Sequence, residues 1–495
     1  MPNDDRKIGR GTAWVAAASA LSGVLDVITT VTCLWLWLTP ADLGTATLAG
    51  AMLPVLERLA QLGMPAAMVR LGDGERRALS TMLWIIIAGS SVVLAATLVL
   101  RGRVGALFGE PIIGSLVVGY GVRLFLSSAH AVPEALLRRE LQFDALTRVR
   151  IAASVGDALG KLVTAYLGAH GHPALRSWCF VIGPLAGGVV TSIGLQLCRP
   201  WWPALVFDRS IAVRALRYGV QLSGGELLYY LYSNADYLVI GRVWGDAAVG
   251  AYRLAYELVL DVVRLISLVT AEVAFPAFAR LRDLCAESRA QRAGELLLRF
   301  TRQNLIAVVP VVVFLAVAAD DLLAVLYPPL PAAATTAAQI LCVVGALRIL
   351  SFVLPAMLAG LGHAGDALAY HALAAVVLPA AFVTAAWVAP ELGYVAVAWA
   401  WAIAYPVVFA VVLWRALVRC HVTLATYVAR TARVFACGLV AAVAAYAVHA
   451  VLPGPAPVRL VVVVIATLTS YAVMLAWLED LTPRSLWRTV RGQTE

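Results

Sequence analysis

Four charged residues recur at helical spacing within one apolar stretch of the chain. They are Arg253, Glu257, Asp261 and Arg264, at intervals of four, four and three, so they share one face of a helix. Because two acids lie between two arginines, the side chains could form a ladder of ion pairs that neutralises itself. Alternatively, the stripe lines a cavity, where the planar Arg guanidinium groups would bind phosphate oxygens two at a time. The spacing leaves both interpretations open.

Other ionisable residues also lie deep within long apolar runs. Each such charge costs about 2.5–3.5 kcal/mol at the centre of a membrane helix, so these side chains should face a bundle interior or a cavity. The basic candidates for binding an anionic substrate are Arg58, Arg123, Lys161, Arg253, Arg264 and Arg348. The acidic candidates for ion pairing or ion coupling are Asp26, Glu57, Asp157, Asp236, Glu257 and Asp261. Two further acids, Glu226 and Glu272, are expected near the cytoplasmic rim.

The sequence neighbours of three basic candidates indicate different partners. Lys161 follows Asp157 by four positions, which predicts an ion pair within one helix. Arg123 and Arg348 have no acid within four positions. Each therefore needs a partner on another helix or a ligand.

Arg58 directly follows Glu57, but adjacent side chains diverge by about 100° around a helix. The two cannot neutralise each other well, so Arg58 is expected to face a cavity. Burial favours the protonated form of a carboxyl group, so Asp26, Glu57 or Asp236 could couple transport to protons.

The composition indicates a membrane protein. Apolar residues make up 62% of the 495 residues and charged residues only 14%, whereas a soluble protein has about 25% charged residues. A bilayer core about 30 Å thick requires about 20 apolar residues per helix, and unpaired backbone cannot cross it. The long apolar runs therefore predict an all-α integral membrane protein with about fourteen transmembrane helices.

Turn-forming residues separate the expected helices. Gly72-Asp73-Gly74, Pro328-Pro329 and Pro453-Gly454-Pro455 are examples. The predicted helices span residues 11–38, 43–69, 79–100, 112–137, 149–169, 174–197, 214–241, 246–277, 295–319, 333–359, 364–388, 393–414, 431–451 and 457–479. The first run is too long for a cleavable signal peptide and is expected to remain as helix 1.

Basic residues between the helices gather in alternate loops. The loops of the other set carry only Arg101, Arg103, Arg176, Arg242 and Arg459. Because basic loops stay on the cytoplasmic side, this asymmetry predicts an even number of helices and two cytoplasmic termini. The chain is thus expected to cross the membrane several times.

Short internal similarities suggest a repeated architecture. Residues 38–44 (LTPADLG) and 244–250 (WGDAAVG) are outside turns that end in an apolar residue and a glycine, and Val132-Pro133 and Leu354-Pro355 end helices at corresponding places. They predict two six-helix lobes related by a pseudo-two-fold axis along the membrane normal, plus two C-terminal helices. The expected ranges are 1–205 for the N-lobe, 206–420 for the C-lobe and 421–495 for the last helices and a cytoplasmic tail.

Motifs for catalysis, metal binding and nucleotide hydrolysis are absent from the sequence. The seven cysteines are scattered without a C-x-x-C pair, the seven histidines form no H-E-x-x-H, and there is no G-x-x-x-x-G-K-[ST] segment. We therefore expect no enzymatic activity, no metal and no cofactor, with H+ or Na+ as the possible coupling ion. The net charge of +9 lies between the apolar runs rather than on a basic face, so nucleic acid is not an expected partner.

Several segments together carry a family resemblance. The most specific block comprises residues 232–245 (YSNADYLVIGRVWG), 249–256 (VGAYRLAY) and 275–280 (FPAFAR), and residues 137–143 (LRRELQF) and 341–348 (LCVVGALR) add to it. These segments resemble the polysaccharide transport family of the multidrug/oligosaccharidyl-lipid/polysaccharide (MOP) exporter superfamily. The resemblance covers nearly the whole chain and is closest to the branch containing colanic-acid exporters, which implies a multi-pass protein of a bacterial cytoplasmic (inner) membrane.

The resemblance implies a flippase. Members of this family have fourteen helices in two lobes and move undecaprenyl-pyrophosphate-linked oligosaccharide repeat units by alternating access, for lipopolysaccharide or exopolysaccharide biosynthesis. The implied partners are this lipid-linked substrate, membrane lipids, and a polysaccharide polymerase with other assembly proteins. Many relatives carry an acid shortly before Leu62-Gly63, where this chain has Gln61, and Glu57 lies one turn earlier.

Two other classes of protein remain alternatives. A cation-coupled small-molecule efflux pump of the same superfamily would depend on Na+ or H+ and would change drug accumulation. A membrane glycosyltransferase or polymerase would need a long extracytoplasmic loop or an acidic catalytic cluster, whereas the outside loops expected here are short.

Overall fold

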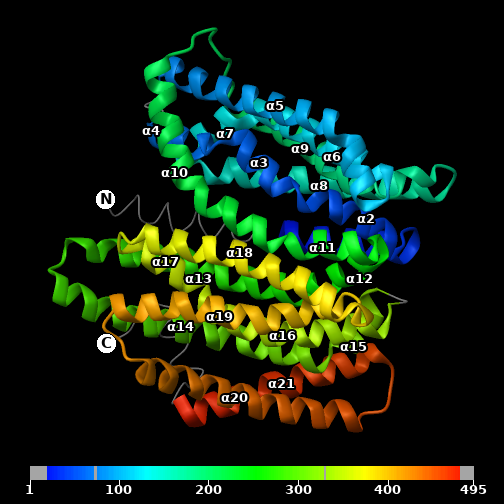
Figure 1. Cartoon of the computed structure of the whole chain (residues 1–495), viewed down its shortest axis with the longest axis vertical. Coiled ribbons are helices and arrows are strands. Elements are labelled where there is room, and N and C mark those ends of the chain that lie inside the picture. Colours follow the sequence, from blue (N-terminus) through cyan, green and yellow to red (C-terminus); the bar gives the residue numbers. More distant parts are fainter. Residues whose placement is uncertain (1–18, 20, 72–74, 328–329, 480–495) are drawn as a thin grey trace. The chain divides into compact units, whose positions relative to one another are not determined.

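The regular structure of this chain is helical. The computed structural model describes residue 19 and residues 21–71, 75–327 and 330–479, and no strand occurs within them (Figure 1). The first eight residues of the predicted helix 1, the turn at residues 72–74 and the Pro328-Pro329 turn lie outside the described residues.

Nine of the described helices are long and apolar enough to cross a membrane. They are Arg76–Phe108, Pro111–Arg139, Cys179–Cys198, Ala286–Val317, Ala332–Gly360, Ala364–Val388, Val395–Arg419, Leu424–Val451 and Ala456–Leu478. The chain is therefore a multi-pass membrane protein. The remaining helices are shorter, broken or less apolar, so the count of fourteen stays a prediction.

The chain divides into two compact units, Met1–Gly250 and Ala251–Glu495. The first contains the helix Leu21–Leu36, α2 (Pro40–Ala51), α3 (Leu53–Gln61), α4 (Met64–Leu71), α5 (Arg76–Phe108), α6 (Pro111–Ser127), η1 (Ser128–His130), α7 (Ala131–Arg139), α8 (Phe143–Ala169), η2 (Pro173–Leu175), α9 (Cys179–Cys198), α10 (Arg209–Ser233) and α11 (Ala235–Trp244). Helix α12 (Asp246–Tyr256) begins in this unit. The predicted lobe ranges, with a boundary at 205/206, stay predictions.

The second unit is also a bundle of helices. It contains η3 (Glu257–Asp261), α13 (Val262–Ala279), η4 (Arg280–Asp283), α14 (Ala286–Val317), α15 (Ala319–Leu326), α16 (Ala332–Ser351), α17 (Val353–Gly360), α18 (Ala364–Val388), η5 (Pro390–Leu392), α19 (Val395–Arg419), α20 (Leu424–Val451) and α21 (Ala456–Glu479). Helix α18 packs on α19, and α20 packs on α21 and α14.

Small residues bring α8 and α9 together in the first unit, where the two helices lie side by side (Figure 1). A Cβ atom on Gly183 would lie 2.5 Å from Asp157 Oδ1, and one on Gly187 would lie 2.8 Å from the Ala153 carbonyl oxygen. Such glycines let membrane helices approach closely, so packing replaces the hydrophobic driving force that lipid cannot supply.

The predicted helix 2, residues 43–69, is wrong as a single helix because the chain breaks twice. The first break is at Met52, two residues before Pro54, whose ring cannot continue the hydrogen-bond ladder. The second is at Leu62 and Gly63, which both have positive φ values, 48° and 71°. A left-handed pair followed closely by Pro65 ends α3 and starts α4.

Four other predicted helices also contain interruptions. The predicted helix 4 contains the 3-10 turn Ser128–His130, between α6 and α7. The predicted helix 7 is broken at Asn234, between α10 and α11. The predicted helix 8 contains the π-helical turn Glu257–Asp261, and the predicted helix 10 is broken at Phe352, three residues before Pro355. Proline accounts for the last break, because it removes a backbone donor and clashes with the preceding turn.

The N-terminal turns of α2 and α12 meet within the first unit. Thr39 and Asp42 form a capping box that starts α2. A Cβ atom on Gly44 would collide with the Asp246 carbonyl group, and one on Gly250 would collide with the Pro40 carbonyl group. Glycine is therefore required at both positions, and the two turns contact each other reciprocally.

Candidate functional site

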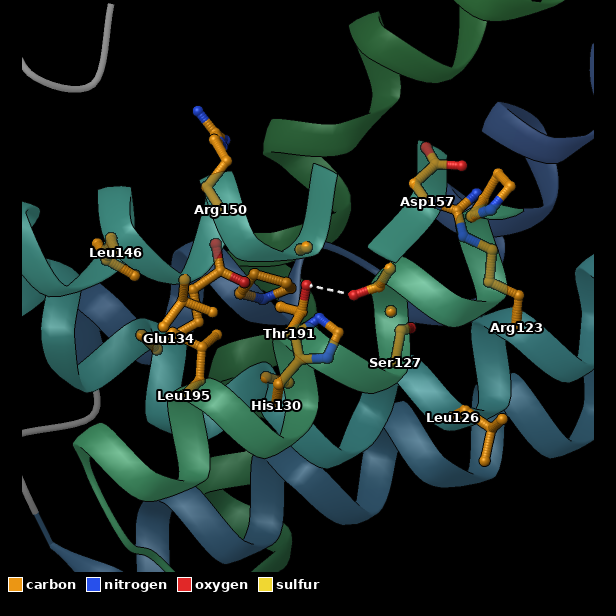
Figure 2. A pocket seen from close by; sticks show the side chains of 18 of the residues that line it. Arg123, Leu126, Ser127, His130, Glu134, Leu146, Arg150, Asp157, Thr191 and Leu195 are labelled. Carbon is orange, nitrogen blue, oxygen red and sulfur yellow. Dashed lines mark hydrogen bonds between the residues drawn. The ribbon is translucent and has the colours of Figure 1, made fainter. Parts of the chain in front are cut away.

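A pocket of about 570 Å³ lies inside the first unit, between α3, α6, α7, α8 and α9. In Figure 2, Glu134 and Leu146 lie toward one end of it and Arg123 and Asp157 toward the other. The volume is typical of ligand pockets, which span about 300–1,000 Å³. This is the candidate functional site.

Each main helix contributes one face at helical spacing. The segment α6 to α7 places Arg123, Ser127, His130 and Glu134 in the pocket; α8 places Arg150, Ser154 and Asp157 there; and α9 places Pro184, Gly188, Thr191 and Leu195 there. Spacings of three and four keep the side chains of one helix on one side. Three helices thus enclose a polar chamber in an otherwise apolar unit.

Several polar groups of the pocket are already paired. Arg138 Nη2 lies 2.6 Å from Glu134 Oε1, and Arg150 Nη1 donates to Ser19 Oγ at 2.8 Å. His130 Nδ1 lies 2.9 Å from Ser192 Oγ. These groups are therefore less available to a ligand.

Arg123, Asp157 and Thr147 are groups of the pocket with unused hydrogen-bonding capacity. Partly buried Arg123 makes no hydrogen bond or ion pair with any residue that the structure describes. Asp157 Oδ1 is buried without a hydrogen-bond partner among them. A guanidinium group in this state can offer its planar donors to an anion.

The predicted ion pair of Lys161 and Asp157 is present, and a second acid, Asp26, joins it. Buried Lys161 donates its hydrogen bond to Asp26, on the helix Leu21–Leu36, and its Nζ atom is 3.7 Å from Asp157 Oδ1. The closer contact is between helices because Asp26, 135 positions away, is brought within hydrogen-bonding distance by folding. Lys161, Asp157 and Asp26 therefore form one charged cluster beside the pocket.

Glu57 and Arg58 face different neighbours, as their adjacent positions predict. Glu57 lines the pocket and accepts a hydrogen bond from Gln61 Nε2 at 3.2 Å. Arg58 Nε lies 3.0 Å from Oε2 of Glu226 on α10. Glu226 lies nine residues beyond Arg217, about 14 Å along the helix, and its expected place at the cytoplasmic rim stays a prediction. The side chain of Glu272 lies outside the described part of the chain.

Asp236 is fully buried at the start of α11, where it accepts a hydrogen bond from the Tyr237 backbone N–H at 2.9 Å. This carboxyl group does not line the pocket.

The charged stripe of the first prediction lies at the start of the second unit and pairs locally. Arg253 Nε lies 2.5 Å from Glu257 Oε1, and Arg264 Nε lies 3.1 Å from Asp261 Oδ1. The π-helical turn separates the two pairs. These contacts favour the ion-pair ladder, and the binding role of the stripe stays a prediction.

Arg348 is buried in the second unit among aromatic side chains. It is 4% exposed, and its Nη1 donates to the Tyr256 hydroxyl at 3.2 Å. Its Cζ lies 5.2 Å from the Trp401 ring centre and 5.9 Å from that of Tyr405. A guanidinium over aromatic faces is stabilised by their negative charge, so Arg348 has partners on other helices.

Sequence reasoning missed several pocket residues. His130, Glu134 and Arg150 line the pocket, although they were not candidates. A signal was present: Arg123, His130 and Glu134 recur at intervals of seven and four, on one helical face.

One group in the second unit has the composition of a metal site. Asp320, Asp321 and His449 place ligand atoms within 4.8 Å of one another. Arg459, however, pairs with Asp321, and His449 Nε2 lies 3.1 Å from Asp321 Oδ2. The buried carboxylate is already neutralised, so this group fits an ion-pair network better than a cation.

Comparison with known proteins assigns the family. A profile of the family described as polysaccharide biosynthesis protein matches residues 37–328, more than half of the chain. The chain belongs to this family. The family expected from the sequence is thereby confirmed.

Two relatives of this polysaccharide biosynthesis protein illustrate the similarity. The lipopolysaccharide biosynthesis protein WzxC of Escherichia coli (strain K12) is 22% identical over 348 residues, covering 68% of this chain and 67% of that protein. The teichuronic acid biosynthesis protein TuaB of Bacillus subtilis (strain 168) is 22% identical over 360 residues, covering 71% and 70%.

Solved structures share the fold of this family member. The lipid II flippase MurJ in an inward closed conformation superposes with a TM-score of 0.74 at 12% identity, covering 95% of this chain and 99% of MurJ. An inward-facing multidrug resistance MATE family transporter of the MOP superfamily gives 0.60 at 16% identity, covering 80% and 95%. The expected MOP-type fold is confirmed.

Proposed function

We propose that this protein is a flippase that moves undecaprenyl-pyrophosphate-linked oligosaccharide repeat units across the cytoplasmic membrane by alternating access. Membership in the polysaccharide biosynthesis protein family supports a role in surface polysaccharide assembly. The fold shared with a lipid II flippase supports transport rather than chemical conversion of the glycan. A sugar head group with a diphosphate cannot cross hydrocarbon alone, because its polar groups would lose their hydrogen bonds.

The observation that carries this proposal is the partly buried Arg123 guanidinium in a polar pocket of a membrane protein. It has no counter-ion at hydrogen-bonding distance among the described residues. A charge in such a place is costly and is normally paired, unless it serves a ligand. An anionic head group would supply the missing partner.

The test is transport of a lipid-linked oligosaccharide in vesicles containing the purified protein. Glycan that reaches the opposite leaflet is measured with a membrane-impermeant lectin. Arg123→Ala should lower the initial rate about tenfold or more, because a charge-assisted hydrogen bond contributes about 1.5–3 kcal/mol. Arg123→Lys should retain part of the rate, and Arg101→Ala, at an exposed arginine, is the matched control. Equal rates for Arg123→Ala and the unmodified protein would contradict the proposal.

For the architecture, we propose fourteen membrane helices in an N-lobe (1–205), a C-lobe (206–420) and a C-terminal pair (421–495), with both termini in the cytoplasm. The reciprocal contact of the α2 and α12 turns supports a repeat, because Gly44 meets Asp246 and Gly250 meets Pro40. Each of the two sequence pairs, 40/246 and 44/250, has the spacing expected from the internal similarity.

For the energy source, we propose coupling to an ion gradient, H+ or Na+, through a buried carboxylate. Two carboxyl groups are the main candidates. Asp236 is 0% exposed, and Glu57 lines the pocket. Asp26 is the third, through its pair with Lys161. Asp→Asn and Glu→Gln replacements are compared in transport assays at several pH values. Unchanged pH profiles in all three would remove the proposal.

A cation-coupled efflux pump remains the alternative, supported by the fold shared with MATE transporters. Such a pump would need free carboxylates to bind a cationic drug. In the pocket, Glu134 is paired with Arg138, and Asp157 lies near Lys161. Export of a cationic dye without glycan transport in the same vesicles would favour the pump.

A further inference from the structure

The seam between α3 and α10 exposes charge within the first unit. Glu226 is 54% exposed at the side chain and Arg58 is 30% exposed. Glu226 lies among Gly224, Gly225 and Leu227, about 14 Å beyond Arg217 along α10. A charged carboxylate this exposed would be costly against hydrocarbon, so the seam is expected to open onto water.

Arg58 is neutralised in this seam but its hydrogen-bonding capacity is not used. Its Nε atom is buried and lies 3.0 Å from Glu226 Oε2, yet it makes no hydrogen bond with a described residue. Its Cζ lies 5.6 Å from the ring centre of Tyr230, one turn beyond Glu226 on α10. Glu57 does not compete, because it lines the pocket on another side of α3.

The pairing is therefore electrostatic and loose. A half-exposed carboxylate is screened by water, and exposed ion pairs contribute only about 0–1 kcal/mol. A diphosphate carries more charge and more acceptor oxygens than a carboxylate, and a guanidinium can meet two of those oxygens at once. At Arg58, such a ligand would be favoured over Glu226.

We infer that Glu226 is a built-in placeholder anion that the diphosphate of the transported lipid displaces from Arg58. Glu226 balances the Arg58 charge while the site is empty. Glu226 pairs with the guanidinium again when the substrate leaves. This competition keeps the affinity for the substrate low enough for its release. The ring of Tyr230 supports the guanidinium in both states. The inference rests on the proposed function, since it takes the lipid carrier's diphosphate as the ligand.

Binding of farnesyl pyrophosphate to the purified full-length protein tests the inference directly. Glu226→Gln removes the competing charge and should tighten binding about three- to tenfold. In the vesicle assay, the same variant should lower both the apparent KM and the kcat of transport, because release becomes slow. A merely structural role would not lower KM. Arg58→Ala should abolish the gain when combined with Glu226→Gln.

The matched controls use other acids and other ligands. Asp144→Asn removes a carboxylate from an exposed ion pair with Arg148 and should change neither quantity. Glu226→Asp keeps the charge and should bind as the unmodified protein does. Inorganic pyrophosphate should show the same direction of change with weaker binding, which separates a free anion from a lipid-linked one. If Glu226→Gln folds poorly, Glu226→Ser gives the same expected direction.

Weaker or unchanged farnesyl pyrophosphate binding by both Glu226→Gln and Glu226→Ser would overturn the inference. If the unmodified protein still transports lipid-linked oligosaccharide in an Arg123-dependent manner, the proposed function stands without it. If binding changes as expected but no glycan is transported, the proposed function fails and the seam remains a diphosphate site.

Discussion

Charged side chains in the first unit differ in how completely they are neutralised. Lys161, with a side chain that is 7% exposed, contacts both Asp26 and Asp157. Arg58 has a loose counter-ion, and Arg123 has none at hydrogen-bonding distance among the described residues. The cluster around Lys161 is therefore structural, whereas Arg58 and Arg123 are groups that a ligand can reach.

Replacing Lys161 tests whether the cluster of Lys161, Asp26 and Asp157 stabilises the fold. Lys161→Ala leaves two carboxylates near each other without a cation. Because Asp26 is 55% exposed, the cost should lie between the roughly 0–1 kcal/mol of an exposed pair and the about 3 kcal/mol of a buried one. We expect a lower melting temperature of the detergent-solubilised protein. The double variant Lys161→Ala with Asp26→Asn should recover part of the loss.

The exposed pair of Arg148 and Asp144 provides the control, since both side chains are about three-quarters exposed, at 76% and 75%. Arg148→Ala should change stability by at most about 0.5 kcal/mol. If Lys161→Ala is as mild as Arg148→Ala, the buried cluster has no structural role.

At the scale of elements, the break between α3 and α4 positions α10. Gly63 has a φ of +71°, and a Cβ there would collide with the backbone of Gly219 on α10. Close packing at this point helps to place Glu226 of α10 beside Arg58 of α3.

Gly63→Ala should therefore destabilise the first unit through both backbone strain and the clash with Gly219, by about 1–3 kcal/mol. Thermal unfolding in detergent measures it. Gly102→Ala is the matched control, because Gly102 lies in α5 with open space around it. Alanine favours a helix over glycine by up to about 1 kcal/mol, so this control should be neutral or stabilising.

A second contact between elements is the ion pair of Asp321 on α15 with Arg459 on α21. Hydrogen bonding from Arg459 holds the pKa of the Asp321 carboxyl group below its usual range. A lowered folded-state pKa means that the stabilisation is present at neutral pH and disappears as the pH falls through that pKa, below about 4.

Asp321→Asn should thus lower the melting temperature at pH 7, and its difference from the unmodified protein should shrink as the pH approaches 3. Melting curves recorded across this range test the sign. Asp320→Asn, at a half-exposed neighbour, should have a smaller effect. A difference in melting temperature that stays constant down to pH 3 would contradict a stabilising ion pair between ionised Asp321 and Arg459.

At the scale of the whole molecule, the orientation in the membrane can be tested with cysteines. Cys198 and Cys285 are exposed and the other five are buried. Both exposed thiols lie in segments expected on the cytoplasmic side, whereas His172 lies in a loop expected outside.

In intact cells, a membrane-impermeant maleimide should label His172→Cys in a background lacking the native exposed cysteines. It should leave Cys198 and Cys285 of the natural sequence unlabelled until the membrane is permeabilised. Labelling of Cys285 in intact cells would reverse the proposed orientation. The positive-inside distribution of arginine is the physical reason for the expectation.

Local properties of the chain were predictable because they depend on nearby residues. The scarcity of charge and the long apolar runs determined a helical membrane protein, and Pro and Gly positions marked most of the turns. The divergence of Glu57 and Arg58 also followed from helix geometry alone. The breaks at Met52, Leu62 and Asn234 did not, because membrane helices also tolerate Pro, Gly and polar residues without breaking.

By itself, then, the sequence determined the class of protein, the family and which residues are charged at depth. Only the tertiary structure decided which charges meet: Lys161 with Asp26, Arg58 with Glu226, and Arg348 with an aromatic cage. These partners come from helices distant in the chain. Their distances depend on how helices pack, and spacing within one helix carries no information about that.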